Sequence, residues 1–153
     1  MSTPDAPAPV RLVTDDYFAR FLAEVLRLES FFPEFRASHL AKVFPRSGLY
    51  SYPDGSHVVE QGEQGRDIYI IYTGWVEILQ SLGSAAADLA RLAPGDIVGE
   101  IALLRDGVRV ATAVAGGEAQ IFRLVFEDMQ YLLQHNPPLC EHLRALAAKR
   151  LGA

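Results

Sequence analysis

The spacing of apolar residues along the chain changes twice, from helical to strand-like and back to helical. After Asp15 or Asp16, each of which is a good N-cap, apolar residues recur at helical spacing to about Leu28. A second, shorter helix is predicted over residues 33–43, with Pro33 in its first turn. The expected buried partners of this second helix are Leu40 and Phe44.

After residue 46, short segments rich in Val, Ile, Tyr and Thr alternate with turn sequences such as YPDGS, APGD and AGGE. The predicted strands are GLYSY, HVVEQ, DIYIIY, GWVEILQ, DLARL, ATAVA and AQIFRLV. The dipeptide Thr73-Gly74 predicts a tight hairpin between DIYIIY and GWVEILQ, and SLGSAAAD is typical of a hairpin tip. The whole pattern predicts an antiparallel sandwich or barrel.

Helical spacing returns after Leu124, where VFEDMQYLLQHN and NPPLCEHLRALAAKRL predict two helices. Asn136 is the expected cap of the second of these helices, which has prolines in its first turn. The predicted apolar faces are Phe126, Met129, Tyr131, Leu132 and Leu133 on the first helix, and Leu139, Leu143, Leu146, Ala147 and Leu151 on the second. Two helices, a β-roll and two further helices give an α+β outline.

Length and composition limit the number of domains. With 153 residues, half of them hydrophobic, the chain is long enough for one domain with a core and too short for two. The beginning of the chain is rich in Pro, Ala, Ser and Thr, which anchor poorly. We therefore expect residues 1–12 to be a disordered lead and residues 13–153 to form a single domain.

Charge and chemistry limit the classes of partner. The formal charge of −5 argues against general nucleic-acid binding, so no DNA partner is expected. The chain has no run of about 20 apolar residues and its first ten residues do not resemble a secretory signal, which predicts a cytoplasmic protein without membrane contact. Cys140 is the single cysteine and cannot form an internal disulfide. The scattered histidines, which lack metal-site spacing, are His39, His57, His135 and His142.

The segment GEIALLRDGVRVAT, residues 99–112, places a carboxylate and a guanidinium at either end of a short apolar stretch. Gly99 lets the backbone approach a ligand closely, and a helical turn after it would point the amides of Ile101 and Ala102 back toward that position. Arg109, brought round by an Asp-Gly turn, can face the same anion with a bidentate contact. These positions together predict a small anion site.

Glu100 has a different requirement, because an ionised carboxylate only accepts hydrogen bonds and cannot bind the same anion. It needs a donor, which is either a sugar hydroxyl or Arg109 itself. The first alternative describes a sugar phosphate bound beside the segment. The second is a structural salt bridge, and the chemistry of the two residues alone leaves both alternatives open.

GEIALLRDGVRVAT resembles the phosphate-binding cassette of the cyclic nucleotide-binding domains found in catabolite-activator-type regulators, cyclic-nucleotide-dependent kinases and gated channels. In that cassette a Gly-Glu pair opens a short apolar helix and an arginine follows nine residues after the glutamate, a separation that Glu100 and Arg109 keep. The preceding segment, YPDGSHVVEQGEQGRDIYIIYTGWVEIL, matches the glycine turns of the family at Gly55, Gly62, Gly65 and Gly74. The resemblance covers residues 31–151 and is specific because the whole ordered set is present.

The resemblance implies an antiparallel β-roll (double-stranded β-helix, jelly-roll-like) flanked by N-terminal and C-terminal helices. It also implies a non-catalytic sensor for a cyclic nucleotide, cAMP first and cGMP as the alternative, with no metal and no other cofactor. Arg109 would pair with the exocyclic phosphate oxygens, and Glu100 would accept from the ribose 2′-hydroxyl. The phosphate cradle would be completed at Gly99 and by the amides of Ile101, Ala102 and Val110. The implied base pocket consists of Val59, Ile70 and Val98.

Three features depart from the pattern of the family. Val108 replaces the usual proline before Arg109, and Val110 replaces the usual Ala, Ser or Thr after it. The second replacement removes a hydroxyl and disfavours cGMP against cAMP. The sequence ends at AAKRLGA, so no helix-turn-helix is expected, and a lid over the base would come from residues 140–151 or from a partner.

Ligand binding is expected to shift the two C-terminal helices, to which an unknown protein partner or a second copy would respond. The apolar stripe of the last helix would support such a homodimer. A second hypothesis is an interaction module of the same fold in which Glu100 and Arg109 are simply paired, and a third is a metal-dependent β-barrel enzyme. Trp75 is expected to be a core or edge-strand aromatic, and Arg66 and Asp67 a local ion pair.

Overall fold

The computed structural model describes residues 8–29, 32–82, 85–104 and 106–150. Its helices are α1 (Asp16–Val25), α2 (Ala37–Val43), α3 (Glu100–Leu104), α4 (Phe126–His135) and α5 (Pro137–Arg150). Its strands are β1 (Val10–Arg11), β2 (Gly48–Tyr52), β3 (His57–Val59), β4 (Ile68–Leu82), β5 (Ala85–Leu92), β6 (Ile97–Val98) and β7 (Thr112–Leu124). Among these residues, no helix is both long enough and apolar enough to span a membrane.

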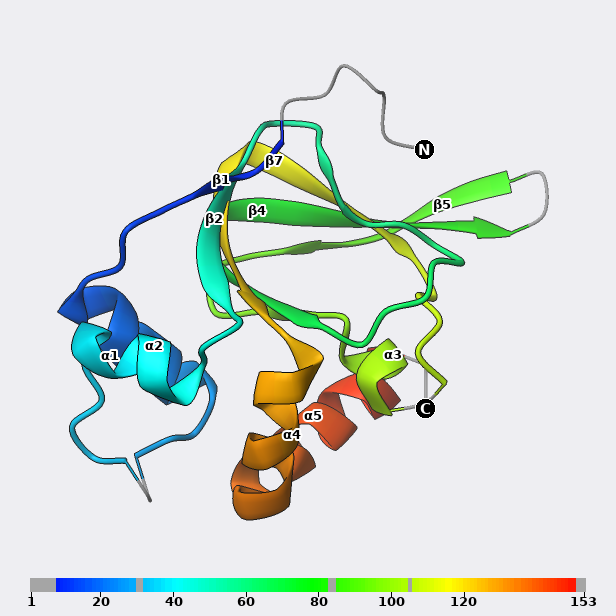
Figure 1. Ribbon diagram of the computed structural model, residues 1–153. Helices are drawn as coiled ribbons and strands as arrows, with labels where there is room; N and C mark the ends of the chain where they lie inside the picture. Colours follow the sequence, from blue (N-terminus) through cyan, green and yellow to red (C-terminus); the bar gives the residue numbers. More distant parts are fainter. Residues whose placement is uncertain (1–7, 30–31, 83–84, 105, 151–153) are drawn as a thin grey trace.

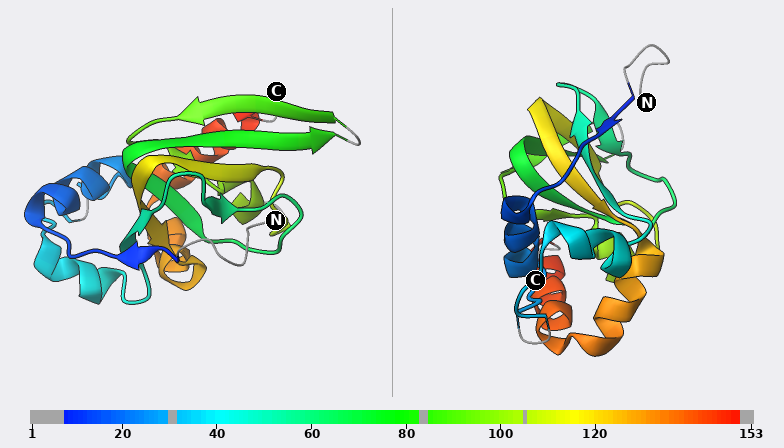
Figure 2. Two further views of the ribbon diagram at one scale, coloured as in Figure 1. Left: turned by 90° about the horizontal axis from the view of Figure 1, so that it is seen from above. Right: turned by 60° about the vertical axis from the view of Figure 1, so that its left-hand side comes forward.

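The strands form one antiparallel sheet in the order β1-β2-β7-β4-β5, with β3 paired to β7 and β6 paired to β4. The sheet curls into a roll, with α1 and α2 together on one side and α3, α4 and α5 gathered at its lower end in Figure 1. The β4–β5 hairpin projects beyond the roll (Figure 2). This arrangement confirms the predicted α+β fold, an antiparallel β-roll flanked by N-terminal and C-terminal helices.

The hairpin predicted at Thr73-Gly74 is wrong, because DIYIIY and GWVEILQ belong to one strand, β4. Both halves of β4 pair with β7, from Ile68↔Leu124 to Leu79↔Thr112. Since one neighbour runs along both halves, the chain does not reverse. Gly74 instead adopts a φ of 79° at a register shift, where a side chain would meet the backbone of β7.

The turn predicted at AGGE is wrong for the same reason, since ATAVA and AQIFRLV both lie on β7. The extra residues of β7 bulge between the pairs Thr73↔Gln120 and Trp75↔Gly116. The reversal of the chain lies further along, where β4 and β5 pair as far as Leu82↔Ala85. This confirms a hairpin at SLGSAAAD, although residues 83–84 lie outside the described part of the chain.

The helices begin at specific side-chain contacts. Asp15 is the N-cap of α1, as predicted, and its Oδ1 accepts from the amide of Phe18 at 2.8 Å. The predicted start of α2 near Pro33 is wrong: Pro33 lies in a turn, and α2 begins at Ala37, whose amide donates to Asp16 at 2.9 Å. The predicted partners Leu40 and Phe44 are buried. The cap of α5 is Asn136, as predicted, which accepts weakly from the amide of Leu139 at 3.4 Å.

Strand β1 lies within the segment expected to be disordered, so that expectation is wrong for Val10 and Arg11. These residues pair with Ser51 and Tyr50 at the edge of β2. The pairing needs only main-chain groups, and this explains why a composition with little apolar anchoring did not reveal it. Residues 1–7 lie outside the described part of the chain.

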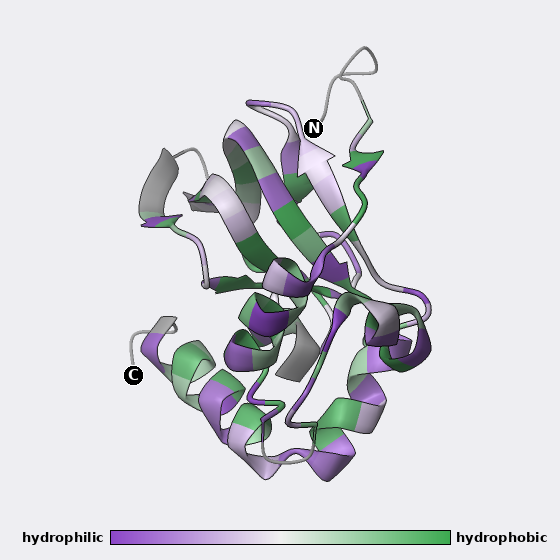
Figure 3. Ribbon diagram, turned by 90° about the vertical axis from the view of Figure 1, so that its left-hand side faces the viewer, coloured by the Kyte–Doolittle hydropathy of each residue, from purple (hydrophilic) through white to green (hydrophobic). Residues whose placement is uncertain are grey.

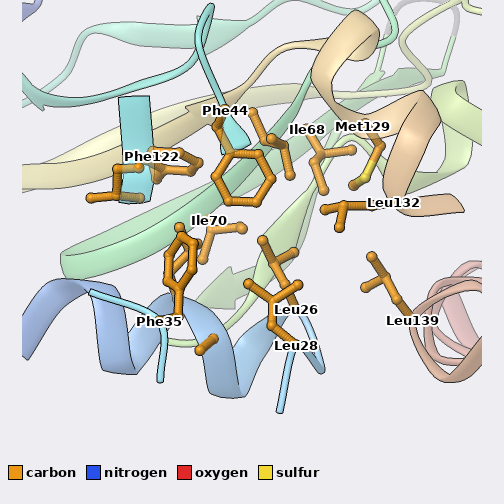
Figure 4. Packing of buried hydrophobic residues seen from close by; sticks show 14 of the residues in the cluster. Leu26, Leu28, Phe35, Phe44, Ile68, Ile70, Phe122, Met129, Leu132 and Leu139 are labelled. Carbon is orange, nitrogen blue, oxygen red and sulfur yellow. The ribbon is translucent and has the colours of Figure 1, made fainter. Parts of the chain in front are cut away.

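Two separate clusters of buried residues hold the fold together. One lies between the helices and the roll and includes Ile68 and Ile70 of β4, and Figure 4 shows part of it. The other lies inside the roll and includes Tyr69 and Ile71 of the same strand. Successive residues of a strand face opposite sides, so neighbours on β4 join different clusters. Figure 3 shows hydrophobic and hydrophilic residues along the strands and helices.

The apolar stripe of α5 packs inside the chain. Leu139 and Leu143 are fully buried in the cluster between the helices and the roll, together with Met129 and Leu132 of α4. Leu139 and Leu143 are therefore not available to a second copy, and a dimer through the rest of this helix stays a prediction. Leu151, which was assigned to the same stripe, lies outside the described residues.

Candidate functional site

A cavity of about 820 Å³ lies within the roll and is closed in part by α3 and α5. Its apolar lining consists of Val59, Ile78, Ala90, Leu92, Val98, Ile101, Ala102, Val110, Ala111, Ala113 and Leu146. Gly99 and the polar or charged residues Gln80, Asp96, Glu100, Arg109 and Lys149 complete it. The cavity therefore combines apolar walls with a region that carries both a buried acid and a buried base.

The predicted site residues converge on this cavity with one exception. Those that line it are Val59, Val98, Gly99, Glu100, Ile101, Ala102, Arg109 and Val110. Ile70 does not line it, so the prediction that it belongs to the base pocket is wrong. Its side chain is fully buried between the helices and the roll, because it lies on the face of β4 opposite to Tyr69 and Ile71.

Arg109 is held by main-chain oxygens. Its Nη2 donates to the carbonyl of Asp67 at 2.8 Å, and its Nη1 lies 3.5 Å from the carbonyl of Gly99. The guanidinium also lies 5.8 Å from the ring centre of Tyr69, and only 5% of the residue is exposed. A guanidinium has five N–H donors, so these contacts leave others for a ligand.

Burial lowers the pKa of Arg109, while Tyr69, Asp67 and Glu63 act in the opposite direction. The group remains a cation at neutral pH, because an arginine side chain does not lose its proton in proteins. Burial also raises the pKa of Tyr69, which keeps the phenol neutral under the guanidinium. The site thus holds a fixed positive charge on a residue that is almost fully buried.

Two glycines provide the space that Arg109 occupies. A Cβ on Gly65 would lie 3.0 Å from Arg109 Nη2. A Cβ on Gly99 would lie 2.6 Å from Arg109 Nη1 and 2.9 Å from the carbonyl oxygen of Asp67. Gly99 also has a φ of 99°, a conformation that other residues rarely adopt. Close packing around the arginine therefore explains Gly65 and Gly99.

The backbone around Arg109 is paired with the loop before β4. The amide of Gly62 donates to Arg109 O at 2.8 Å, and the amide of Arg109 donates to Glu63 O at 2.9 Å. An isolated β-bridge joins Gln64 to Val108. These contacts fix the segment although it has valine in place of the usual proline.

Helix α3 presents the acidic side of the site. Glu100 is its first residue and is 1% exposed, and the next two residues, Ile101 and Ala102, are also buried. The carbonyl of Ala102 accepts from the amide of Gly107 at 3.0 Å, which ties the helix to the segment that carries Arg109. The acid and the base therefore belong to one locally braced unit.

Residues 49–136 match the sequence model of the family described as cyclic nucleotide-binding domain. The chain belongs to this family. At the level of the family it is a regulatory ligand-binding domain and not a catalytic one.

Two relatives are similar in sequence to this chain. The cyclic AMP receptor protein of Thermus thermophilus is 37% identical over 101 residues, which are 65% of this chain and 47% of the relative. The cAMP-dependent protein kinase regulatory subunit of Mycosarcoma maydis is 32% identical over 107 residues, 70% of this chain and 20% of that protein. This cyclic nucleotide-binding domain thus spans less than half the length of either relative.

The regulatory domain of Toxoplasma gondii PKA, solved with cAMP, has a similar structure with a TM-score of 0.69. Its sequence is 24% identical, and the match covers 87% of this chain and 49% of that one. The likeness shows that the cyclic nucleotide-binding domain described here has the β-roll fold of that structure.

The sequence analysis missed part of the lining of the cavity. The residues missed are Ile78, Gln80, Ala90, Leu92, Asp96, Ala111 and Ala113. A period of two along β4 would have found Ile78 and Gln80, because both share a face with the buried Val76. Leu146 and Lys149 belong to the segment 140–151 that was expected to supply a lid, and they reach the cavity through the packing of α5 beside α3.

The structure also gives the contacts of Arg66, Asp67 and Trp75, and the expected ion pair between the first two was wrong. Asp67 pairs with Arg123 at 2.8 Å instead of with Arg66, whose guanidinium lies over the ring of Phe126. Trp75 lies on strand β4 against the glycines of the β7 bulge, is 36% exposed and does not line the cavity. Within the described ranges, no group of three or more His, Cys, Asp or Glu side chains is arranged to hold a metal ion.

Proposed function

We propose that the cavity binds a 3′,5′-cyclic mononucleotide, cAMP in preference to cGMP, and that the chain acts as a non-catalytic sensor. The observation that carries this proposal is the joint presence of Arg109, Glu100 and apolar walls in one cavity. A cyclic mononucleotide has a matching arrangement of anion, sugar hydroxyl and flat base. The membership of the family supports the same ligand class.

In this proposal the phosphate lies between Arg109 and the start of α3. Arg109 pairs with the exocyclic oxygens, which suit the fork of donors on a guanidinium. The amides of Ile101 and Ala102 contribute to the cradle, because the first amides of a helix have no partner within it. The amide of Val110, the residue after Arg109, completes it. Glu100 accepts from the ribose 2′-hydroxyl, a role that suits a buried carboxylate with acceptor oxygens only.

The base lies against the apolar wall of the cavity. Val59 and Val98 belong to this wall, as proposed from the resemblance, and Ile78, Leu92 and Ala113 extend it. Val110 offers no hydroxyl to the amino group of guanine, which favours adenine. The names of the two relatives, a cyclic AMP receptor and a cAMP-dependent kinase subunit, support the same preference.

Occupancy is relayed through the C-terminal helices. Leu146 and Lys149 of α5 form part of the cavity wall, so a ligand that contacts them favours one position of α5 over others. Helix α4 precedes α5 directly and contacts it. An unidentified protein partner responds to this change. The cytoplasmic location of the protein stays a prediction.

A thermal-shift titration with cAMP and with cGMP tests the proposal. A ligand at 100 times its dissociation constant stabilises the folded state by about 2.7 kcal/mol, which raises the melting temperature by several degrees. Arg109→Ala should abolish this shift without unfolding the domain. Arg91→Ala is the matched control, because Arg91 lies over Trp75 outside the cavity and should leave the shift intact.

The alternative function, an interaction module without a ligand, gives a different result. In that case neither nucleotide raises the melting temperature of the unaltered protein. Arg109→Ala would then lower the melting temperature by the same amount with and without nucleotide, as expected for a residue with a structural role only.

A further inference from the structure

Asp67 joins the arginine of the cavity to helix α4. Its main-chain oxygen accepts from Arg109 Nη2 at 2.8 Å. Its carboxylate Oδ1 accepts from the amide of Phe126, the first residue of α4, also at 2.8 Å. Its Oδ2 accepts from Arg123 Nη2 at 2.8 Å and from Arg123 Nε at 3.0 Å. One residue therefore contacts the cavity through its backbone and α4 through its side chain.

The carboxylate of Asp67 supplies a contact that α4 does not provide for itself. The N-cap of α4 is Val125, which has no side-chain hydrogen bond to the first turn. Asp67, which lies 59 residues away in sequence, supplies the missing side-chain acceptor. A carboxylate is favourable there because the first amides of a helix are free and carry a partial positive charge.

The residue before Asp67 makes a parallel connection. The Arg66 guanidinium lies 5.5 Å from the ring centre of Phe126. On its other side, a Cβ on Gly107 would lie 3.0 Å from Arg66 Nε, and the amide of Gly65 donates to Gly107 O at 2.7 Å. The segment from Gly65 to Asp67 is thus held between the arginine-bearing turn and the first residue of α4.

We propose that Asp67 is a positioning residue that couples occupancy of the cavity to the first turn of α4, an inference that rests on the proposed function. An anion that pairs with the remaining N–H groups of Arg109 pulls on a guanidinium whose Nη2 stays hydrogen-bonded to the Asp67 carbonyl. Any displacement of the guanidinium then acts on residue 67, whose carboxylate holds the amide of Phe126. Because such coupling is reciprocal, the state of α4 changes the affinity for nucleotide by the same factor.

Hydrogen exchange of the full chain, measured with and without saturating cAMP, tests this coupling. The variants are Asp67→Ala, which removes both side-chain contacts, and Asp67→Asn, which keeps an acceptor oxygen for Phe126. Glu77→Ala is the matched control. Glu77 lies on β4 and its Oε1 also accepts from an arginine, Arg91 Nη2, at 2.8 Å, but Glu77 does not touch α4 or line the cavity. The readouts are the exchange rate of Phe126 and, as a sign of binding, the exchange of residues 99–102.

In the unaltered protein and in Glu77→Ala, cAMP should change the exchange rate of the Phe126 amide by about fivefold or more. A factor of about five is the lower end of the range that is typical of allosteric coupling between two sites. In Asp67→Ala this ratio should fall to about one while residues 99–102 remain protected by cAMP. Asp67→Asn should restore the ratio to within about twofold of the unaltered protein, since its amide oxygen can accept from Phe126. If Asp67→Ala does not fold, this last comparison decides, and a ratio of one in Asp67→Asn overturns the coupling.

The other outcomes separate the coupling from the proposed function. If Asp67→Ala accelerates exchange equally with and without cAMP and keeps the ratio, Asp67 is a helix cap only and the coupling is overturned. If cAMP protects residues 99–102 but leaves Phe126 unchanged in the unaltered protein, the coupling is overturned and the ligand assignment stands. If cAMP changes neither region, both the proposed function and the coupling fail.

Discussion

The guanidinium of Arg109 occupies the volume that a side chain at Gly99 would need. A Cβ at residue 99 would lie 2.6 Å from Arg109 Nη1, which is closer than real contacts of this kind. The glycine that opens the motif and the arginine near its end are therefore one packing unit. This relationship ties the conformation of the turn before α3 to the position of the buried cation.

Gly99→Ala is expected to abolish nucleotide binding, because the added methyl group displaces Arg109. Gly95→Ala is the matched control: Gly95 has a similar φ of 92°, but no atom lies within 4 Å of its Cβ position. Each substitution should lower the free energy of unfolding by about 1–3 kcal/mol through backbone strain. Isothermal titration calorimetry with cAMP should show binding in Gly95→Ala alone, and equal affinities of both variants would contradict this account of the site.

Ile70→Ala is expected to destabilise the domain without changing the affinity for nucleotide. Ile70 is fully buried between the helices and the roll, so the substitution should lower the free energy of unfolding by about 2–5 kcal/mol. Urea denaturation measures this loss. Val59→Ala provides the comparison. Because Val59 lines the cavity, this substitution should weaken nucleotide binding by roughly tenfold. A weaker affinity of Ile70→Ala for nucleotide would contradict this assignment and indicate that Ile70 contributes to the base pocket.

Val110→Thr is expected to raise the affinity for cGMP relative to cAMP. The substitution keeps the shape of the side chain and adds a hydroxyl at the cavity wall, worth roughly a two- to tenfold change in the ratio of affinities. The contact from Gln80 Nε2 to Val110 O at 3.1 Å involves the main chain and should persist. Competition binding with both nucleotides measures the ratio, and Val108→Thr, at a residue that does not line the cavity, should leave it unchanged.

Asp128→Ala is expected to lower stability through a buried polar network at the start of α4. Asp128 Oδ2 accepts from Ser47 Oγ at 2.6 Å and from the amide of Arg46 at 2.9 Å, and Ser47 Oγ accepts from the amide of Val125 at 3.0 Å. Loss of the carboxylate leaves buried donors without their acceptor and should cost about 1–3 kcal/mol in urea denaturation. Glu127→Ala, at the exposed neighbour, should cost less than about 0.5 kcal/mol.

Several elements and the charged end of the cavity follow from local sequence. The cap at Asp15, the strand GLYSY and the helix at VFEDMQYLLQHN each carry their own signal, and the structure confirms all three. The spacing of Glu100 and Arg109 located the cavity because both residues belong to one locally braced segment. These features depend on interactions between residues that are close in sequence.

The errors arise where a distant neighbour decides the outcome. Thr73-Gly74 has the composition of a reversing turn, but pairing with β7 on both sides makes it a bulge. Ile70 is as apolar as Ile71, and only the register of the roll decides which of them faces inward. Ala111 and Ala113 line the cavity, but nothing in the sequence near them indicates it.

The alternation along β4 also limits how the protein can evolve. Ile68 and Ile70 belong to the helix-facing cluster, while Tyr69 and Ile71 belong to the cluster inside the roll. Inserting or deleting one residue here would exchange the two sets and damage both clusters at once. Homologous chains should therefore keep the number of residues between Asp67 and Gly74 constant, and tolerate length variation in the projecting β4–β5 hairpin instead.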